Sequence, residues 1–249
     1  MRERTAQIQA PAVLNQESVR AFAEELERAC LNQAHRVILL EGSGGTFCRG
    51  MDLAMLAKLE ADTEDRPNLS AGLEEFASCL RRIRYAGKPV IAVVDGQALA
   101  GGVGIAAACD LVVATTSSSF GLSELLLGLV PAIVMPLLLE RMPAQKVRLW
   151  ALAAGAHSAA EAQETGLVDV VAEPRHLERT VSYWVRQLSR SDRAAVAKLK
   201  SLSAEVPALG FEAALRRGVS LTGETLRDGS VLSGIRSFLE GEAAPWEVA

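Results

Sequence analysis

Short apolar segments that end in glycine-containing loops mark the predicted strands of this chain. The residues AQIQAP (6–11) alternate between polar and apolar side chains, which predicts a first strand. Residues 36–47 are predicted to be a buried strand that breaks into a glycine loop, and 88–96 a buried strand rich in β-branched residues; strand character resumes in 110–122. A further short strand is expected near the end of 157–173, after a helix and a glycine turn.

Segments with helical spacing of apolar residues separate these strands. In residues 15–32 the side chains of Val19, Phe22, Leu26 and Cys30 share one helical face, and Asn15 is placed to cap the helix. Other helices are predicted from about Asp52 to residue 61, over 73–87 with Gly87 as the stop, and in a helix-rich region from Ser123. Ser158 and Glu161 have the spacing of a capping box, and 175–241 is almost entirely helical.

The order strand, glycine loop, helix repeats three or four times before the helical end of the chain. This order is typical of an α/β fold with a helical region at the C-terminus. We divide the chain into a core at residues 1–190 and a helical region at residues 191–249.

Composition excludes several classes of function. The 249 residues suffice for one domain with a sizeable core, and the net charge of −4 lacks the basic excess of a nucleic-acid binder. The longest apolar run, residues 125–139, is too short for a membrane span and contains two prolines. We find no signal peptide and expect a cytoplasmic protein. The four cysteines lack CxxC spacing, so we expect reduced thiols and no metal site.

Two segments share one form, in which a buried strand leads through a glycine loop directly into a helix. They are VILLEGSGGTFCRGMDL (37–53) and VIAVVDGQALAGGVGIAAACD (90–110). Free N–H groups at such a helix start bind anions or stabilise a developing oxyanion. The alternative is that the glycines only allow close packing of helix and strand. A phosphate-binding loop is excluded because no GK[ST] follows and GxGxxG is absent.

At these residues the sequence resembles the crotonase (enoyl-CoA hydratase/isomerase) superfamily. FCRGMDL (47–53) resembles F-x-x-G-x-D-[LI], and residues 96–115 resemble G-x-[AC]-x-G-G-G-x-x-L-x-x-x-C-D. FGLSELLLGLVP (120–131) resembles F-x-x-P-E-x-x-x-G-x-x-P, and AAEAQETGLVDVV (159–171) resembles A-x-x-A-x-x-x-G-L-V-[DN]-x-V. The resemblance implies an α/β spiral of ββα repeats with C-terminal trimerisation helices. It also implies an oxyanion hole formed by the backbone N–H groups of Met51 and Gly101.

The resemblance further implies which side chains act. Hydratases of the family use two glutamates; the first falls on Gly104 here, and the second falls on Glu124, the expected catalytic residue. Alone, Glu124 could equally be a solvated acid that caps a helix. Asp52 is the next candidate for the base. The expected substrate-binding residues are Cys48, Arg49, Gly50, Gly102, Gly104 and Leu129.

Within the superfamily, the chain looks most like the dehydratases of polyketide β-branching cassettes. These enzymes have glycine at the position of Gly104 and convert a 3-hydroxy-3-methylglutaryl group on an acyl carrier protein into the 3-methylglutaconyl form. The companion decarboxylases carry a histidine in the C-terminal helices, whereas this chain has none after His176. His35 and His157 are expected to be structural or surface residues. Alternatives are a Δ3,Δ2-enoyl isomerase and a catalytically weak binding subunit.

The resemblance also implies partners. No cofactor is expected, because the phosphopantetheine arm of a carrier protein or of coenzyme A belongs to the substrate. An acidic carrier would need basic residues near the site, and the candidates, which could equally form a solvated helix face, are Arg49, Arg81, Arg82, Arg84 and Lys88. The last helices carry more apolar positions than a lone helical region should expose, namely Leu215, Val219, Leu221 and Leu226, and the resemblance implies a trimer or a dimer of trimers. The family's N-terminal β-hairpin is either lost here or the first strand is unusually short, so we expect a partly uncovered sheet edge.

Overall fold

A computed structural model describes residues 4–58 and 66–248 of the chain. Its main sheet has five parallel strands in the order β1-β2-β4-β6-β9. The register pairs Ile38 with Val90 and Ile91 with Leu111. The strands are β1 (Thr5–Gln9), β2 (Val37–Glu41), β4 (Val90–Val94), β6 (Leu111–Thr115) and β9 (Val170–Ala172). As expected, β1 lies at an edge of this sheet.

A second, smaller sheet has the order β3-β5-β7-β8, with only the last pair antiparallel. Its strands are β3 (Thr46–Cys48), β5 (Gln97–Leu99), β7 (Ser119–Gly121) and β8 (Ala156–Ser158). Consecutive strands therefore go to different sheets: β2, β4 and β6 enter the first, and β3, β5 and β7 enter the second. A helix follows each such pair, which confirms the predicted ββα repeats.

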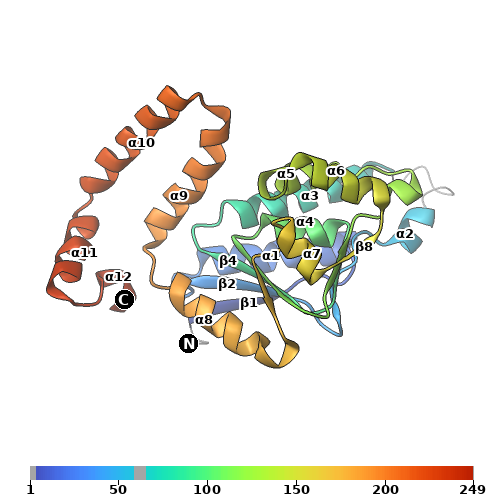
Figure 1. The fold of residues 1–249 in the computed structure, drawn as a ribbon, viewed down its shortest axis with the longest axis horizontal. Helices are drawn as coiled ribbons and strands as arrows, with labels where there is room; N and C mark the ends of the chain where they lie inside the picture. The colour runs from blue at the N-terminus through green and yellow to red at the C-terminus, as the bar shows by residue number, and fades with distance from the viewer. Residues whose placement is uncertain (1–3, 59–65, 249) are drawn as a thin grey trace.

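The main sheet is buried on both faces, as is usual for parallel sheets. Side chains of β2 and β4 alternate between two apolar clusters, so Ile38 and Val90 lie in one and Leu39 and Ile91 in the other. The first cluster includes residues of helices α1 (Gln16–Leu31), α3 (Arg66–Arg84) and α4 (Gly101–Ala108). The second packs under α8 (Leu177–Leu188) through Val181 and Val185. Figure 1 shows α8 separated from α1 and α4 by the strands.

Shorter helices complete the core. They are α2 (Leu53–Lys58), the 3-10 turn η2 (Glu124–Leu127), α5 (Met135–Arg141), α6 (Ala144–Ala153), α7 (Ala159–Glu164) and the 3-10 turn η3 (Pro174–His176). Residues 59–61 of the helix predicted after Asp52 lie outside the described residues. Both predicted caps are confirmed: Asn15 forms a capping box with Ser18, and Ser158 forms one with Glu161. Helix α3 ends at Arg84, three residues before the predicted stop at Gly87.

The last helices form an arm beside the core, with α10 and α11 farther out than α9 (Figure 1). They are α9 (Arg193–Glu205), the 3-10 turn η4 (Val206–Ala208), α10 (Phe211–Leu226), α11 (Gly229–Glu240) and α12 (Pro245–Val248). The buried ammonium group of Lys200 on α9 bonds to Asp110 of the core at 2.7 Å. The indole N–H of Trp246 donates to the carbonyl of Arg190 at 3.0 Å, so the end of the arm returns to its base.

The four cysteines are free thiols, and three of them are buried, as the sequence predicts. No helix in residues 4–58 or 66–248 is long and apolar enough to cross a membrane.

Candidate active site

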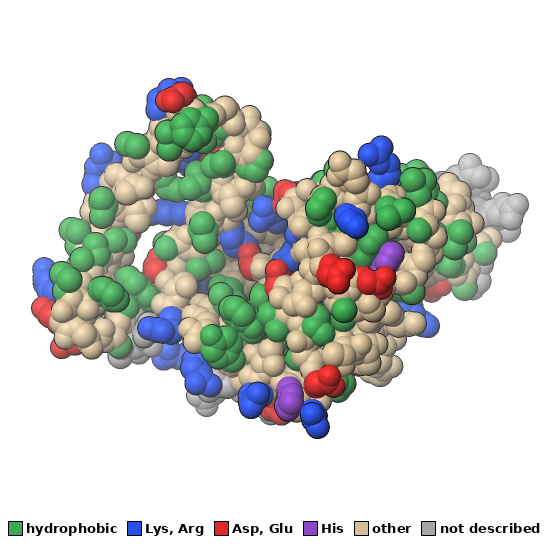
Figure 2. Space-filling view, in the orientation of Figure 1, with side chains coloured by type: hydrophobic (Ala, Val, Ile, Leu, Met, Phe, Trp, Pro, Cys, Tyr) green, Lys and Arg blue, Asp and Glu red, His purple; other side chains and the backbone are tan. Residues whose placement is uncertain are grey.

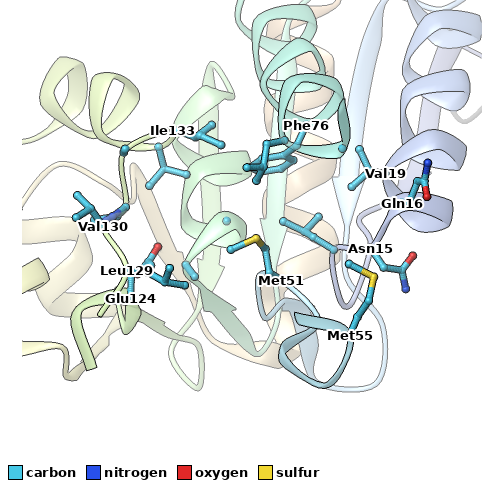
Figure 3. A pocket seen from close by; sticks show the side chains of 18 residues that line it. Asn15, Gln16, Val19, Met51, Met55, Phe76, Glu124, Leu129, Val130 and Ile133 are labelled. Carbon is cyan, nitrogen blue, oxygen red and sulfur yellow. The ribbon is translucent and has the colours of Figure 1, made fainter. Parts of the chain in front are cut away.

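A cavity of about 380 Å³ lies among the first turns of α1, α4 and η2, the helices α2 and α3, and the loop of residues 129–134. Figure 3 shows Glu124 and Leu129 at one side, Asn15 and Val19 at the opposite side, and Met51 and Phe76 between them. Residues far apart in the sequence line it, namely Leu14, Asn15, Gln16, Val19, Met51, Met55, Gly72, Leu73, Phe76, Ala100, Gly101, Glu124, Leu129, Val130, Pro131, Ala132, Ile133 and Val134. The sequence placed Met51, Gly101, Glu124 and Leu129 at a common site, and the structure brings these four together.

The loop from β3 to α2 carries the first of the two predicted amides. Gly50 has a φ of +82°, a left-handed conformation that glycine adopts without strain. Leu14 forms an isolated parallel bridge with Met51: its N–H donates to Gly50 and its carbonyl accepts from Asp52. This pattern leaves the N–H of Met51 without an acceptor among the described residues. The amide is therefore a free donor in the cavity wall.

The turn from β5 into α4 carries the second amide. Gly101 is the first residue of α4, so its N–H has no partner within the helix. A Cβ atom at Gly50 would lie 3.4 Å from the nitrogen of Gly101, so the two loops touch. A Cβ atom at Gly102 would overlap the carbonyl oxygen of Cys48. Both interpretations of the glycines therefore apply. The glycines allow close packing of helix and strand, and that packing brings two free N–H groups to one cavity.

Glu124 begins η2, just after β7, and its side chain is 9% exposed. Its Oε2 atom is buried and has no hydrogen-bond partner in the described chain. Burial raises the pKa of this carboxyl above 4.5, and backbone hydrogen bonds at Glu124 and Ser123 oppose that shift only in part. The alternative of a solvated capping acid is therefore wrong. A buried carboxyl with a raised pKa suits proton transfer near neutral pH.

The other expected substrate-binding residues lie in different places relative to the cavity. Leu129 lines the cavity, whereas the side chains of Cys48 and Arg49 and the glycines at 50, 102 and 104 are not part of its lining. The Cys48 thiol is fully buried, and burial raises its pKa to about 11. A thiol with this pKa is not a nucleophile at neutral pH. Cys48 contributes its backbone, through the close approach to Gly102.

Val134 occupies the space beside Gly104. A Cβ atom at Gly104 would overlap Val134 Cγ1 and lie 2.9 Å from Val134 Cβ, and Val134 is itself 3% exposed. The space beside Gly104 is therefore filled by a buried methyl group.

Gly104→Glu is expected to lower the unfolding free energy by about 1–3 kcal/mol, because the new side chain collides with Val134 in a packed core. Urea unfolding measures this loss. The double variant with Val134→Ala should regain part of it, since the smaller side chain frees the space. Equal stability of Gly104→Glu and the native protein would show that Val134 does not restrict this position.

Other candidates from the sequence lie outside the cavity lining. The Asp52 carboxylate accepts from the backbone N–H of Ala54 at 3.0 Å and of Met55 at 3.1 Å, so it holds the start of α2. His157 stacks on Trp150 with ring centroids 3.9 Å apart, and burial lowers its pKa, as burial also does for His35. None of the described histidines lines the cavity.

The proposed basic patch needs one correction. Lys88 is 1% exposed, and its ammonium group donates to the carbonyls of Ala29 and Asn32 at the end of α1. Burial lowers its pKa to about 8. Lys88 therefore cannot contribute to a surface, and the prediction that placed it at the site mouth is wrong. A lysine beside a proline before a strand gave no sign of this burial in the sequence.

Sequence reasoning missed much of the apolar lining. Val19 and Phe76 were assigned to helices but not to the site, because a helical face that packs on a core looks the same as one that faces a cavity. For Met55 and Ile133, too, no sequence motif indicated a place in the cavity lining. Among the lining residues that the structure describes, Glu124 is the one charged side chain. The described part of the chain contains no cluster of three or more potential metal ligands.

Several known proteins resemble this chain in sequence or in structure. A family model described as enoyl-CoA hydratase/isomerase matches residues 6–248. Carnitinyl-CoA dehydratase of Salmonella typhi is 32% identical over 219 residues, which cover 85% of this chain and 81% of that protein. Bacillaene synthase dehydratase PksH of Bacillus subtilis (strain 168) is 28% identical over 221 residues, covering 88% and 82%. A crystal structure of a putative enoyl-CoA hydratase/isomerase (crotonase) from Legionella pneumophila superimposes with a TM-score of 0.87 at 26% identity, covering 99% and 96%.

Proposed function

The chain belongs to the enoyl-CoA hydratase/isomerase family, and from this membership we propose that it is an acyl-thioester lyase with Glu124 as its single acid–base residue. One observation carries the proposal. A buried carboxyl, whose Oε2 atom has no hydrogen-bond partner in the described chain, faces the same apolar cavity as two backbone N–H groups that have no acceptor among the described residues. Free N–H donors beside a proton-transfer group are the requirement for forming an enolate from a thioester.

The proposed reaction removes water from a 3-hydroxyacyl thioester. The N–H groups of Met51 and Gly101 bind the thioester oxygen, and Glu124 takes the proton from the α-carbon, so that the C–H electron pair moves into the enolate. The enolate then expels the β-hydroxyl group, which takes the same proton from Glu124 and leaves as water. One carboxyl can perform both transfers if the proton and the hydroxyl leave from the same face, each within hydrogen-bond reach of about 2.6–3.2 Å.

For the substrate we propose a carrier-bound 3-hydroxy-3-methylglutaryl group, which would yield the 3-methylglutaconyl group of polyketide β-branching. The glycine at position 104 together with Glu124 supports this choice, as does the relative named bacillaene synthase dehydratase. A tertiary hydroxyl leaves more readily than a secondary one, which lessens the need for a second acid at Gly104.

A Δ3,Δ2-enoyl isomerase is the second candidate, and the cavity lining favours it. The lining described here contains no Lys or Arg that could pair with the distal carboxylate of a glutaryl chain. Burial of an unpaired carboxylate is costly, whereas an uncharged enoyl chain suits apolar walls such as Phe76, Val130 and Ile133. The isomerase also needs one base, which moves a proton along the chain without loss of water.

One assay separates the two candidates. The protein is incubated with the 3-hydroxy-3-methylglutaryl thioester and, separately, with a β,γ-enoyl thioester, each on a carrier protein and on coenzyme A. Mass spectrometry detects the loss of one water molecule, and ultraviolet absorbance detects conjugation without change of mass. Loss of water from the first substrate supports the dehydratase; conjugation of the second alone supports the isomerase. No turnover of either would contradict the proposed function.

We still propose an acyl carrier protein as a partner, although most of the five candidate basic residues are either buried or paired with acidic side chains. Arg81, Arg82 and Arg84 pair with Glu74, Glu27 and Glu140 at distances of 2.8–3.1 Å. Arg49 is exposed and follows β3 at the loop that bears the Met51 amide. We therefore propose that Arg49 is the basic residue most directly placed for a carrier near the thioester site.

We propose that the protein assembles as a homotrimer or a dimer of trimers, because the arm of α9–α12 exposes many apolar side chains. Figure 2 shows hydrophobic side chains spread along α10 and α11, with a hollow between the arm and the core. Exposed apolar residues on these helices include Phe211, Leu215, Val219, Leu226, Leu232, Ile235, Phe238 and Leu239. Leu221, also predicted for this surface, is half-buried within the chain. A single chain rarely exposes so continuous an apolar surface.

We expect light scattering to give three or six times the mass of one chain at micromolar concentration. Phe238→Asp should shift this mass toward the monomer, because Phe238 is 82% exposed and would be buried in the assembly. Leu31→Asp is the matched control, since Leu31 is also exposed but ends α1 and does not lie on α10 or α11. A native protein that is monomeric at this concentration would contradict the assembly.

A further inference from the structure

Ala100, the residue before the second free amide, has an unusual backbone conformation. Its φ of 49° and ψ of −116° lie close to the first central position of a type II′ turn, which is dominated by glycine. Ala154, with φ 48° and ψ 27°, is the other non-glycine residue with a positive φ in the described chain. An L-residue in such a conformation is strained and persists only where its surroundings fix it.

The surroundings of Ala100 do fix it on both sides. Its N–H donates to the carbonyl of Gly121 on β7 at 2.8 Å, and its own carbonyl accepts from Val103 at 3.0 Å and from Gly104 at 3.3 Å. The first bond ties the residue to the small sheet and the other two start α4. Between these constraints, the peptide from Ala100 to Gly101 has one orientation available, and it leaves the Gly101 N–H without an acceptor at the cavity.

The methyl group of Ala100 contacts the other amide loop. A Cβ atom at Gly50 would lie only 2.8 Å from the Cβ of Ala100, so the alanine methyl fills the space that the glycine leaves open. Met51 follows Gly50 directly, and Ala100 lines the cavity. The methyl group therefore packs against Gly50, next to the two peptides whose N–H groups face the thioester site.

We propose that Ala100 is a positioning residue for the oxyanion site. Its strained backbone aims the Gly101 N–H into the cavity, and its methyl group, seated on Gly50, fixes the separation between the Gly101 and Met51 amides. Glycine at this position would relieve the strain but would remove the spacer. The inference rests on the proposed function, because it assigns a role in binding a thioester oxygen.

The test is the variant Ala100→Gly, measured for stability and for catalysis. We expect the melting temperature to rise by about 2–4 °C, because the strained alanine is replaced by a residue that suits its backbone angles. We expect kcat to fall by about tenfold with KM changed less than twofold, since a loosened donor stabilises the enolate less well. Ala100→Ser retains the Cβ atom and should keep kcat within about threefold of the native value.

Ala154→Gly is the matched control, because it makes the same change at the other strained alanine, which does not line the cavity. It should raise the melting temperature and leave kcat unchanged. If the role of Ala100 were purely structural, Ala100→Gly would give the same result as this control: a higher melting temperature and an unchanged kcat.

A binding measurement gives a readout independent of turnover. Butyryl-CoA labelled with ¹³C at the carbonyl is bound to each protein, and difference infrared spectroscopy follows the carbonyl stretch. The native protein should shift the band to lower frequency, and Ala100→Gly should shift it less. Equal shifts and equal kcat in the two proteins would overturn the inference alone, as would a fall in melting temperature for Ala100→Gly. No binding of the thioester to the native protein would contradict the proposed function, and with it the role of the amide.

Discussion

Glu124→Gln is expected to lower kcat by about 10²–10⁴-fold, the range that general acid–base catalysis contributes. Glutamine keeps the size of the side chain and its hydrogen-bonding capacity but cannot accept the α-proton. Glu124 is also the one charged side chain in the described cavity lining, so no neighbouring group can replace it there. Steady-state kinetics with the substrate identified by the water-loss assay measures the effect.

The pH dependence gives a second signature of Glu124. Burial raises the pKa of this carboxyl above 4.5 in the free protein, and the reaction needs its ionised form, so kcat/KM should rise with pH through a midpoint above 4.5. A folded-state pKa above the unfolded value means that the folded protein binds more protons between the two values. Stability is therefore lost as the pH rises from 4.5 through the raised pKa. At pH 7 Glu124→Gln should unfold at the same or a higher temperature than the native protein.

Two further variants test the assignment of the base. Asp52→Asn changes the next candidate, whose carboxylate holds the start of α2, and should cost little stability, because asparagine keeps the Oδ1 acceptor and caps a helix about as well as aspartate, with kcat changed far less than by Glu124→Gln. Gly104→Glu should not rescue Glu124→Gln, because Val134 fills the space for the new carboxylate. Near-normal turnover of Glu124→Gln would show that the base lies elsewhere.

Gly102→Ala is expected to damage both stability and catalysis. The new methyl group would overlap the carbonyl oxygen of Cys48 and lie 2.8 Å from its carbonyl carbon, and these backbone atoms cannot rotate away. Helix α4 must then move from β3, at a cost of about 1–3 kcal/mol in unfolding free energy. The same movement separates the Met51 and Gly101 amides, so kcat should fall by about 10²-fold or more.

The neighbouring position provides the comparison for Gly102→Ala. A methyl group at Gly101 would meet the end of the Leu14 side chain at 2.5 Å and Phe76 Cζ at 3.3 Å, and these side chains can shift. Gly101→Ala should therefore lose clearly less stability than Gly102→Ala in denaturant unfolding. Similar losses for both variants would show that the contact with Cys48 is not what limits this position.

The sequence predicted the repeating units of the fold with few errors, because these depend on local patterns. Continuous apolar runs such as 90–94 mark strands that are buried on both faces, and the spacing of Val19, Phe22 and Leu26 marks one helical face. Capping boxes at Asn15 and Ser158 involve residues three apart, so the sequence contains all the partners. Helix α3 is the exception: it begins at Arg66, earlier than the predicted start at residue 73, and ends at Arg84, before Gly87.

The chemistry of the candidate site was predicted in part for the same reason. The glycine loops after two buried strands indicated two helix starts with free N–H groups, and the family motifs identified Met51, Gly101 and Glu124. The sequence could not show that Glu124 is buried with its Oε2 atom unpartnered, because the residues that remove it from water come from distant parts of the chain. It also placed Lys88 on the surface, since a single lysine in a strand boundary has no local sign of burial.

By itself, then, the sequence determined the α/β repeat, the helix caps, the glycine loops and the residue types at the site, all of which depend on near neighbours. Only the tertiary structure decided three further points: the contact of Ala100 with Gly50, the occupation by Val134 of the space beside Gly104, and the raised pKa of Glu124. Each depends on atoms from segments tens of residues apart that packing brings within a few ångströms. Periodicity and motif spacing describe one segment at a time, whereas exclusion of water and steric contact depend on several segments together.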